Sequence, residues 1–281
     1  MATKKQRQRR LARQAHQRRM DRRAQQDRRA RQWGAGIIVA VLVIGVGVGT
    51  AAIGGVFSPA KAKPTAGAKT SPAVSATPSA TPSPSSTPAM VDGKCVYIAA
   101  GKAARKVSLP PATPDTKATY VATIRTNRGR IVMDLLNSRA PCTVNSFVSL
   151  ADQGFFNNTH CQRLTTAAAG YYILQCGDPT GTGSGGPGYE YGSENLTGAI
   201  YPAGTVAMAN ISGEPDSNGS QFFMVYQDSS FPPDYTPFGT IVSGLNIIRN
   251  IAKAGTDNSS GTGDGHPKEK VQIETVTIQK T

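Results

Sequence analysis

The chain has 281 residues, 38% of them hydrophobic, and its 31 Lys and Arg against 17 Asp and Glu give a formal net charge of +14. This length allows one sizeable domain or two small ones. The positive charge is unevenly placed, because residues 1–33 hold 13 basic and 2 acidic side chains whereas residues 118–281 hold 10 and 13. Nucleic-acid binding needs a basic globular surface, so the mildly acidic carboxyl-terminal part argues against a nucleic-acid partner.

The first predicted element is a membrane-spanning helix at residues 34–57, which follows a basic tail at 1–33. These 24 residues include no charged side chain and one polar one, Thr50. At ~1.5 Å per residue such a helix crosses the ~30 Å hydrocarbon layer. A cleaved signal peptide is the alternative, with Ala-Lys-Ala at 60–62 as a loose cleavage site. Because a signal peptide has a short basic region and roughly 7 to 15 apolar residues, we expect an uncleaved anchor.

The basic tail sets the expected orientation of this anchor. Loops rich in Lys and Arg stay on the cytoplasmic side, so we expect a single-pass membrane protein with a cytoplasmic amino terminus and an extracytoplasmic domain. The tail has no apolar stripe, which favours a solvated segment whose Arg residues touch anionic lipid headgroups. An arm that docks on nucleic acid or protein is the alternative. Trp33 stands where an interfacial anchor belongs.

A linker rich in Pro, Ser, Thr and Ala is predicted at residues 58–92. Its prolines stand at positions 59, 64, 72, 78, 82, 84 and 88. Such a composition buries too little apolar surface to fold, and extended polyproline geometry gives it a reach of roughly 100 Å. The segment therefore acts as a spacer. Residues 93–117, which contain Cys95, form a lead-in for which the sequence predicts no fold.

Residues 118–281 are predicted to form one mainly β domain. A helix of about 12 residues should begin at Pro141 and end before Gly154, and a second should lie between Gly244 and Gly255. Strands without βαβ alternation favour an antiparallel sheet, most economically a closed eight-stranded barrel with the two helices as caps. The eight strands are expected at 120–125, 130–136, 161–165, 171–177, 204–209, 221–226, 238–242 and 271–278.

Other chemistry has weaker support. The glycine-rich segment 181–186 satisfies a dinucleotide-binding pattern, but no helix follows it, so a loop is expected and no cofactor. His160 precedes Cys161, which suggests a cysteine nucleophile or a metal site, yet the Cys and His spacing matches no zinc pattern. Four cysteines outside the membrane are better interpreted as disulfides. They allow three pairings, of which Cys161 with Cys176 is favoured because their strands are expected to be neighbours.

Five sequence blocks then carry a family resemblance. They read QRL at 162–164, QCGD at 175–178, MAN at 208–210, NGSQFF at 218–223 and FG at 238–239. In this order and spacing the sequence resembles the cyclophilin family of peptidyl-prolyl cis-trans isomerases over essentially all of 118–281. The resemblance implies an eight-stranded antiparallel barrel with two capping helices, in agreement with the strand pattern. The anchor and spacer resemble the layout of exported cyclophilins of actinobacterial-type bacteria.

The resemblance implies a site without a metal or cofactor. It makes Arg163 the catalytic residue and divides the other positions into walls of a proline pocket and a groove for the flanking peptide. The pocket residues are Tyr172, Ile173, Phe223, Phe231 and Tyr235, and the groove residues are Gln175, Ala209, Asn210 and Gln221.

Some positions depart from the family pattern. Gln162 replaces the usual His before the catalytic Arg, and Tyr235 replaces the pocket His. Tyr172 and Ile173 are conservative replacements of Phe and Met. Ser230 stands where many members have Trp, so tight cyclosporin binding is not expected. The exchanged histidines matter little, because the reaction needs no proton transfer.

The function implied by the resemblance is isomerisation of X-Pro bonds in exported proteins during folding. We expect a monomer whose substrates are proline-containing polypeptides and whose Arg163 hydrogen-bonds the twisted prolyl amide. The alternative is a protein of a second functional class, a tethered module that binds proline peptides without turnover. A spacer head bound to the cell wall is a third, structural alternative.

Overall fold

The computed structural model describes residues 88–211, 214 and 216–281. The predicted tail and membrane helix at 1–33 and 34–57, and most of the predicted linker, lie outside these residues. Among the described residues no helix has the length and apolar character needed to cross a membrane. This finding leaves the prediction for 34–57 as it was.

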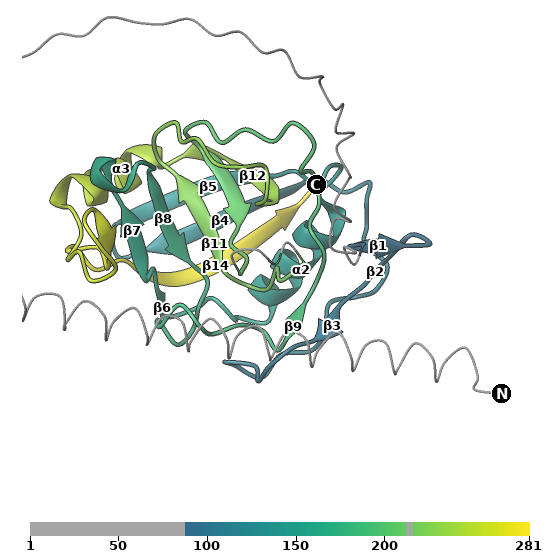
Figure 1. Cartoon of the computed structure of the whole chain (residues 1–281). Helices are drawn as coiled ribbons and strands as arrows, with labels where there is room; N and C mark the ends of the chain where they lie inside the picture. Colours follow the sequence, from purple (N-terminus) through teal and green to yellow (C-terminus); the bar gives the residue numbers. More distant parts are fainter. Residues whose placement is uncertain (1–87, 212–213, 215) are drawn as a thin grey trace, which may run out of the picture. The chain divides into compact units, whose positions relative to one another are not determined.

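A curled antiparallel sheet and two α-helices form the described domain (Figure 1). The order of hydrogen-bonded strands in the sheet is β13-β7-β8-β11-β10-β12-β5-β4-β14-β6. All neighbouring pairs in it are antiparallel. The strands span Tyr120–Thr126 (β4), Gly129–Leu135 (β5), Thr159–His160 (β6), Arg163–Thr165 (β7), Ile173–Cys176 (β8), Thr205–Met208 (β10), Phe222–Val225 (β11), Pro237–Ser243 (β12), Asp264–Gly265 (β13) and Gln272–Lys280 (β14).

The mainly β fold with two helices is confirmed for the described residues, but the closed eight-stranded barrel is wrong. The hydrogen-bonded order has two free ends, β13 and β6. The predicted strand at 161–165 is shorter in the structure, where it is β7 and begins at Arg163. Cys161 and Gln162 lie between β6, which pairs with β14, and β7, which pairs with β8. Cys161 and Gln162 thus connect β6 and β7 along the chain, although the strands at the two ends of the sheet are not joined by backbone hydrogen bonds.

The helix α2 (Pro141–Asp152) lies where the sequence predicts it, with Pro141 in its first turn. The carboxylate of Glu194 caps its amino terminus, because it accepts hydrogen bonds from the backbone N–H groups of Cys142 at 3.1 Å and Thr143 at 2.7 Å. Burial raises the pKa of Glu194, although these hydrogen bonds oppose that shift. Phe147, on the inner face of α2, stacks on Phe156 at 5.1 Å between ring centroids and so joins the helix to the core.

The second predicted helix is α3 (Leu245–Ala254), which buries Ile248 and Ile251. Gly244 precedes it with φ +90°, and a Cβ atom there would lie 2.5 Å from the backbone oxygen of Arg130. Only glycine combines this φ with so close an approach to β5. Gly244, one of the two glycines that predicted the ends of this helix, is therefore required for steric reasons.

The lead-in segment folds against the domain. The strand β1 (Met90–Val91), inside the predicted linker at 58–92, pairs with β2 (Lys94–Cys95), and β3 (Ile98–Ala99) pairs with β9 (Tyr189–Glu190). A disulfide joins Cys95 to Cys142 on α2. Tyr97 donates a hydrogen bond to the Cys142 carbonyl at 2.9 Å. The β1–β2 pair therefore crosses residue 92, where the sequence analysis places the end of the linker.

Candidate functional site

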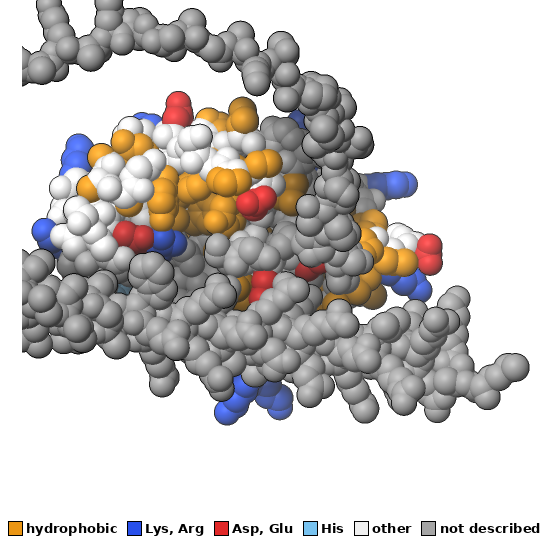
Figure 2. All heavy atoms as spheres, viewed as in Figure 1, with side chains coloured by type: hydrophobic (Ala, Val, Ile, Leu, Met, Phe, Trp, Pro, Cys, Tyr) orange, Lys and Arg blue, Asp and Glu red, His pale blue; other side chains and the backbone are white. Residues whose placement is uncertain are grey.

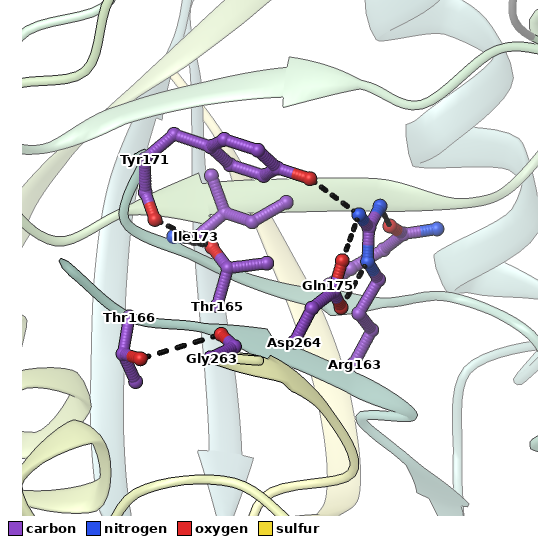
Figure 3. A network of polar contacts seen from close by, with 8 residues as sticks. All are labelled: Arg163, Thr165, Thr166, Tyr171, Ile173, Gln175, Gly263 and Asp264. Carbon is purple, nitrogen blue, oxygen red and sulfur yellow. Dashed lines mark hydrogen bonds and ion pairs between the residues drawn. The ribbon is translucent and has the colours of Figure 1, made fainter. Parts of the chain in front are cut away.

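The strand pair β7–β8 brings the first two predicted site residues together. Arg163 and Gln175 lie directly opposite each other in the antiparallel register. Cross-strand partners point to the same face of a sheet, so both side chains lie on one side. The Nη1 group of Arg163 points to Gln175 Oε1 at 3.4 Å, a long contact (Figure 3).

Asp264, a residue that the sequence analysis did not single out, holds the guanidinium of Arg163. Its carboxylate accepts two hydrogen bonds, from Nε at 2.8 Å and from Nη2 at 2.6 Å (Figure 3). The Tyr171 hydroxyl accepts another from Nη2 at 2.6 Å. The hydrogen bonds with Asp264 hold the pKa of Arg163 above its usual value against the opposing effect of burial. The cation is therefore permanent and oriented along two of its edges.

A tight turn places Asp264 beside Arg163. The strand β13 pairs with β7 so that Asp264 lies opposite Thr165. Gly263, with φ +78°, packs against the short 3₁₀ helix η2 (Ala167–Ala169), where a Cβ atom would lie 2.8 Å from the side chain of Ala168. The backbone N–H of Thr166 donates to the Gly263 carbonyl at 2.8 Å. Glycine at 263 thus lets the β13 turn approach closely enough for the ion pair.

An apolar cluster, named the aromatic cluster below, lies on the same face and apart from the main core. Figure 2 shows hydrophobic side chains gathered on the face of the molecule that carries β8 and β11. The ring of Phe231 is its centre, with centroids of Tyr171 at 5.2 Å, Tyr201 at 5.3 Å and Phe223 at 5.7 Å. Its members are Ile173, Tyr201, Ala207, Phe223 and Val225, with Tyr171, Ala199, Ala209, Phe231 and Tyr235 packed against them.

The predicted pocket residues divide between two clusters. Ile173, Phe223, Phe231 and Tyr235 lie in the aromatic cluster. Tyr172 does not, which is a correction: it packs against the main core, 5.7 Å from the Tyr226 ring.

Strand geometry explains the difference. Residues on β8 and the turn before it alternate between faces, so positions 171, 173 and 175 share the site face and 172 does not. Tyr171 therefore occupies the position that the sequence analysis gave to Tyr172. Strand alternation, counted back from Gln175 in steps of two residues, predicts Tyr171 at this position.

A relay of three glutamine amides lies behind the cation. Gln221 donates through Nε2 to the carbonyls of Gly183 at 2.9 Å and Gly185 at 3.0 Å. Its Oε1 accepts from Nε2 of Gln175 and from Nε2 of Gln162, each at 2.9 Å. The two backbone carbonyls fix the orientation of the first amide, and each hydrogen bond fixes the next. The relay thereby turns Gln175 Oε1 toward Arg163.

The loop that supplies these carbonyls is organised by Asp178. This buried carboxylate accepts hydrogen bonds from the N–H groups of Thr180 at 2.7 Å, Gly183 at 2.7 Å and Gly185 at 3.0 Å. Burial acts to raise the pKa of Asp178, but these hydrogen bonds outweigh it and the pKa is lowered. The glycine-rich segment that matched a dinucleotide pattern is therefore a loop wrapped around a carboxylate of its own chain.

The two remaining groove residues lie at the end of β10. The backbone N–H of Ala209 donates to the Gln221 carbonyl at 2.9 Å. The Asn210 side-chain amide donates to the Asp234 carbonyl at 2.7 Å. This hydrogen bond holds the turn at 232–235, which ends at Tyr235. The structure therefore brings both residues to the border of the aromatic cluster. The side chain of Asn210 is already hydrogen-bonded to a backbone carbonyl.

A disulfide joins Cys161 to Cys176, the pairing that the sequence favoured. Cys161 precedes β7 by two positions and Cys176 ends β8. Both are nearly or fully buried. The bond therefore ties together the two strands that position Arg163 and Gln175.

This arrangement defines a class of site. The cation is permanent, and its Nη1 makes only the long contact to Gln175 among the described residues. It lies next to an apolar aromatic surface, so the site can stabilise a neutral, partly apolar group by directed hydrogen bonding. Such a site can assist rotation about a bond without moving a proton. It has the features of an isomerase for proline-containing peptides.

Comparisons with known proteins agree with this class. The family model described as "Cyclophilin type peptidyl-prolyl cis-trans isomerase/CLD" matches residues 121–278. The chain therefore belongs to the cyclophilin family of peptidyl-prolyl cis-trans isomerases, which confirms the enzyme class expected from the sequence.

Curated relatives include mycobacterial proteins. The chain is 49% identical over 195 residues to a probable peptidyl-prolyl cis-trans isomerase B of Mycobacterium leprae, covering 64% of each chain. It is 46% identical over 206 residues to the protein of that description from Mycobacterium tuberculosis, covering 68% of this chain and 65% of the relative. The matches thus span just under two thirds of the length of these relatives.

Solved structures show the same fold. A cyclophilin type peptidyl-prolyl cis-trans isomerase of Cryptosporidium parvum has a TM-score of 0.50 and 29% identity, covering 58% of this chain and 99% of its own. A second structure of that protein, in the presence of the dipeptide Ala-Pro, has a TM-score of 0.50 and 30% identity over 57% of this chain.

Proposed function

We propose that this chain accelerates rotation about X-Pro peptide bonds in polypeptides, with Arg163 as the catalytic residue and the aromatic cluster as the proline site. One observation carries the proposal. The guanidinium is held on two edges by Asp264 and Tyr171 while it lies beside an apolar surface. A cation held in this way is preorganised for a donor role.

The energy that the site must supply is modest. Twisting an X-Pro bond breaks amide resonance, with a barrier of ~18–20 kcal/mol. Shortening the lifetime from tens of seconds to about a millisecond needs ~10⁴- to 10⁵-fold acceleration, or roughly 5.5–7 kcal/mol. The twisted prolyl nitrogen regains a lone pair, whereas the planar form has none to offer. A donor aimed at that nitrogen therefore stabilises the transition state more than either ground state.

The hydrogen-bond pattern of Arg163 selects the nitrogen that donates. The single N–H of Nε goes to Asp264, and the two N–H groups of Nη2 go to Asp264 and Tyr171. Nη1 carries two N–H groups, and among the described residues it makes only the long contact to Gln175. Arg163 therefore offers Nη1 to the prolyl nitrogen.

The aromatic cluster supplies the rest of the effect. Resonance makes a planar amide more polar than a twisted one, so an apolar surface penalises the planar form more. Phe223 is nearly buried in this cluster, and Phe231 and Tyr235 are partly exposed beside it. Their rings suit the proline ring. Gln175 and Asn210 would hold the flanking peptide still while the other side rotates.

A proline-isomerisation assay on the full-length chain tests this proposal directly. We expect the cis-to-trans rate of a short Ala-Pro peptide to rise linearly with enzyme concentration, with turnover. Binding of the peptide by the folded chain without acceleration would contradict the proposal and support a peptide-binding module.

Replacing Asp264 with asparagine should lower kcat about tenfold with KM changed less than about twofold, because a misaligned catalytic group loses rate more than substrate affinity. Asparagine keeps the shape of the side chain and removes the charge that orients Nε and Nη2. Steady-state kinetics on the same peptide measure the split. Asp134→Asn, an exposed position on β5, is the matched control. Unchanged kcat in D264N would show that Asp264 does not position Arg163.

We also propose that residues 34–57 anchor the chain in the cell membrane with the isomerase domain outside, where it acts on exported polypeptides. The sequence supports this through its apolar stretch and basic tail. The two disulfides among the described residues favour an oxidising compartment. External protease applied to cells with a permeabilised wall should digest the domain and leave a tag on residue 1 intact. Protection of the domain would contradict this topology.

A further inference from the structure

A cavity lies close to Arg163 and is separate from the proline site. Its volume is about 540 Å³, and no member of the aromatic cluster lines it. It is adjacent to the site through Gln162, the chain neighbour of Arg163, and through the loop that carries Gly181. Its lining includes Cys161, Gln162, Gly181, His266, Lys268 and Lys270.

The glutamine relay fixes how Gln162 meets this cavity. The carbonyls of Gly183 and Gly185 require Gln221 to present Nε2 to them, so Gln221 turns Oε1 toward Gln162. Gln162 must then present Nε2 to Gln221, which does not line the cavity. The carbonyl oxygen of Gln162 is therefore the side-chain atom left without a partner among the described residues, in a residue that lines the cavity.

That oxygen is a buried acceptor without a partner. Gln162 is 7% exposed, and its Oε1 has no hydrogen-bond partner among the described residues. A buried acceptor left unpaired is unfavourable, and most such atoms in folded proteins are paired. An N–H donor from a molecule that enters the cavity would satisfy this atom. A peptide backbone carries such donors at every residue except proline.

The charged side chains of the lining include two lysines and one carboxylate, so the charge is basic on balance. Lys268 and Lys270 are exposed and form no ion pair within the described part of the chain. The acidic side chain of the lining, Asp257, is already engaged by the His266 ring at 2.9 Å and by Ser259. Glu269, between the two lysines, pairs with Arg128 at 3.0 Å. Two lysines therefore remain for an anionic ligand.

We propose that this cavity is a subsite for an acidic residue near the proline of the polypeptide substrate. A main-chain N–H of the substrate donates to Gln162 Oε1, and the carboxylate of the acidic residue lies between Lys268 and Lys270. The proposal deepens the proposed function and rests on it, since the peptide reaches this cavity from the proline site. Occupancy is coupled by the relay to Gln175, the neighbour of Arg163 Nη1.

The test measures sequence preference. The full-length chain is assayed on peptides of the form Ala-Ala-Ala-Pro-Ala-Ala in which each flanking alanine in turn is replaced by Asp, Asn or Lys. At one position we expect kcat/KM for Asp to exceed that for Asn about threefold to tenfold, and Lys to rank below Asn. The double variant Lys268→Gln/Lys270→Gln should abolish this preference and leave the Asn peptide unchanged. Lys253→Gln, an exposed lysine on α3, is the matched control.

The outcomes separate this proposal from the one on which it rests. Acceleration of the all-alanine peptide without preference for Asp at any position would overturn the subsite and leave the isomerase function standing. Absence of acceleration on every peptide would overturn the proposed function itself. As a second readout, the side-chain amide resonances of Gln162 should shift when the preferred Asp peptide is added. Equal shifts with the Asn and Lys peptides would also overturn the acidic preference.

Discussion

Arg163→Ala is expected to lower kcat/KM for a proline peptide at least about 30-fold, since removing one preorganised donor costs ~10²- to 10³-fold in comparable sites. The acceleration left over comes from the aromatic cluster, from which this change removes one polar contact, the hydrogen bond to Tyr171. The side chain of Arg163 is 35% exposed and lies outside both apolar clusters, so the fold should persist. A proline-isomerisation assay, with circular dichroism as the check on folding, measures both effects.

Two further variants make this result specific. Arg163→Lys keeps a positive charge but loses the planar fork that meets both oxygens of Asp264, so it should recover only a small part of the lost rate. Arg163→Ala combined with Asp264→Ala removes the carboxylate that the single variant leaves without its partner. The double variant should have the same low activity as Arg163→Ala. Arg125→Ala, exposed on β4, is the control. Wild-type activity in Arg163→Ala would remove Arg163 from the mechanism.

Local sequence signals predicted the regular elements well, for reasons visible in the structure. Each of the eight expected strands has a counterpart among the described residues, and α2 and α3 lie where proline and glycine signals placed them. These signals act within a few residues of the positions they determine. Closure of the sheet depends instead on which distant strands pair across Cys161 and Gln162, and no local pattern encodes that.

The site residues likewise divide into those that local patterns predict and those that depend on distant strand pairing. Ile173, Gln175 and Phe223 could be placed because they alternate along strands within recognisable blocks. Asp264 could not, because it lies about 100 residues from Arg163 in a strand of two residues within a glycine-rich turn. It has no periodicity, and only the pairing of β13 with β7 brings it to the guanidinium. Tyr171 was within reach of sequence reasoning, since strand alternation alone distinguishes it from Tyr172.

The lead-in segment gave no sequence signal of its fold, although it is built into the domain. Its strands β2 and β3, and β1 just before it, have two residues each, which is too short for a period to be detected. Its stability comes from distant partners. Tyr97 packs against the rings of Tyr189 and Tyr191 at 5.3 and 5.6 Å. Arg105 donates to the carbonyls of Gly154 and Phe155, just after α2. Such contacts form only once the rest of the domain is in place.

Removing the disulfide that secures this segment should therefore have a large effect on stability. The bond between Cys95 and Cys142 spans 47 residues. In the chain-entropy description, losing a cross-link of that length lowers the free energy of unfolding by about 4 kcal/mol, against about 3 kcal/mol for the 15-residue span of Cys161–Cys176. Urea denaturation of the oxidised protein, compared with Cys95→Ala/Cys142→Ala, measures the loss.

The two disulfides should also differ in what else they change. Cys95 and Cys142 lie in an apolar cluster with Ala89, away from β7 and β8, so the folded fraction of the first double variant should keep its full kcat/KM. Cys161→Ala/Cys176→Ala loosens the strands that carry Arg163 and Gln175, so it should lower kcat/KM as well as stability. A first variant that loses less than about 1 kcal/mol would show that the lead-in is held by its other contacts, because the entropic effect of a 47-residue cross-link would then be absent.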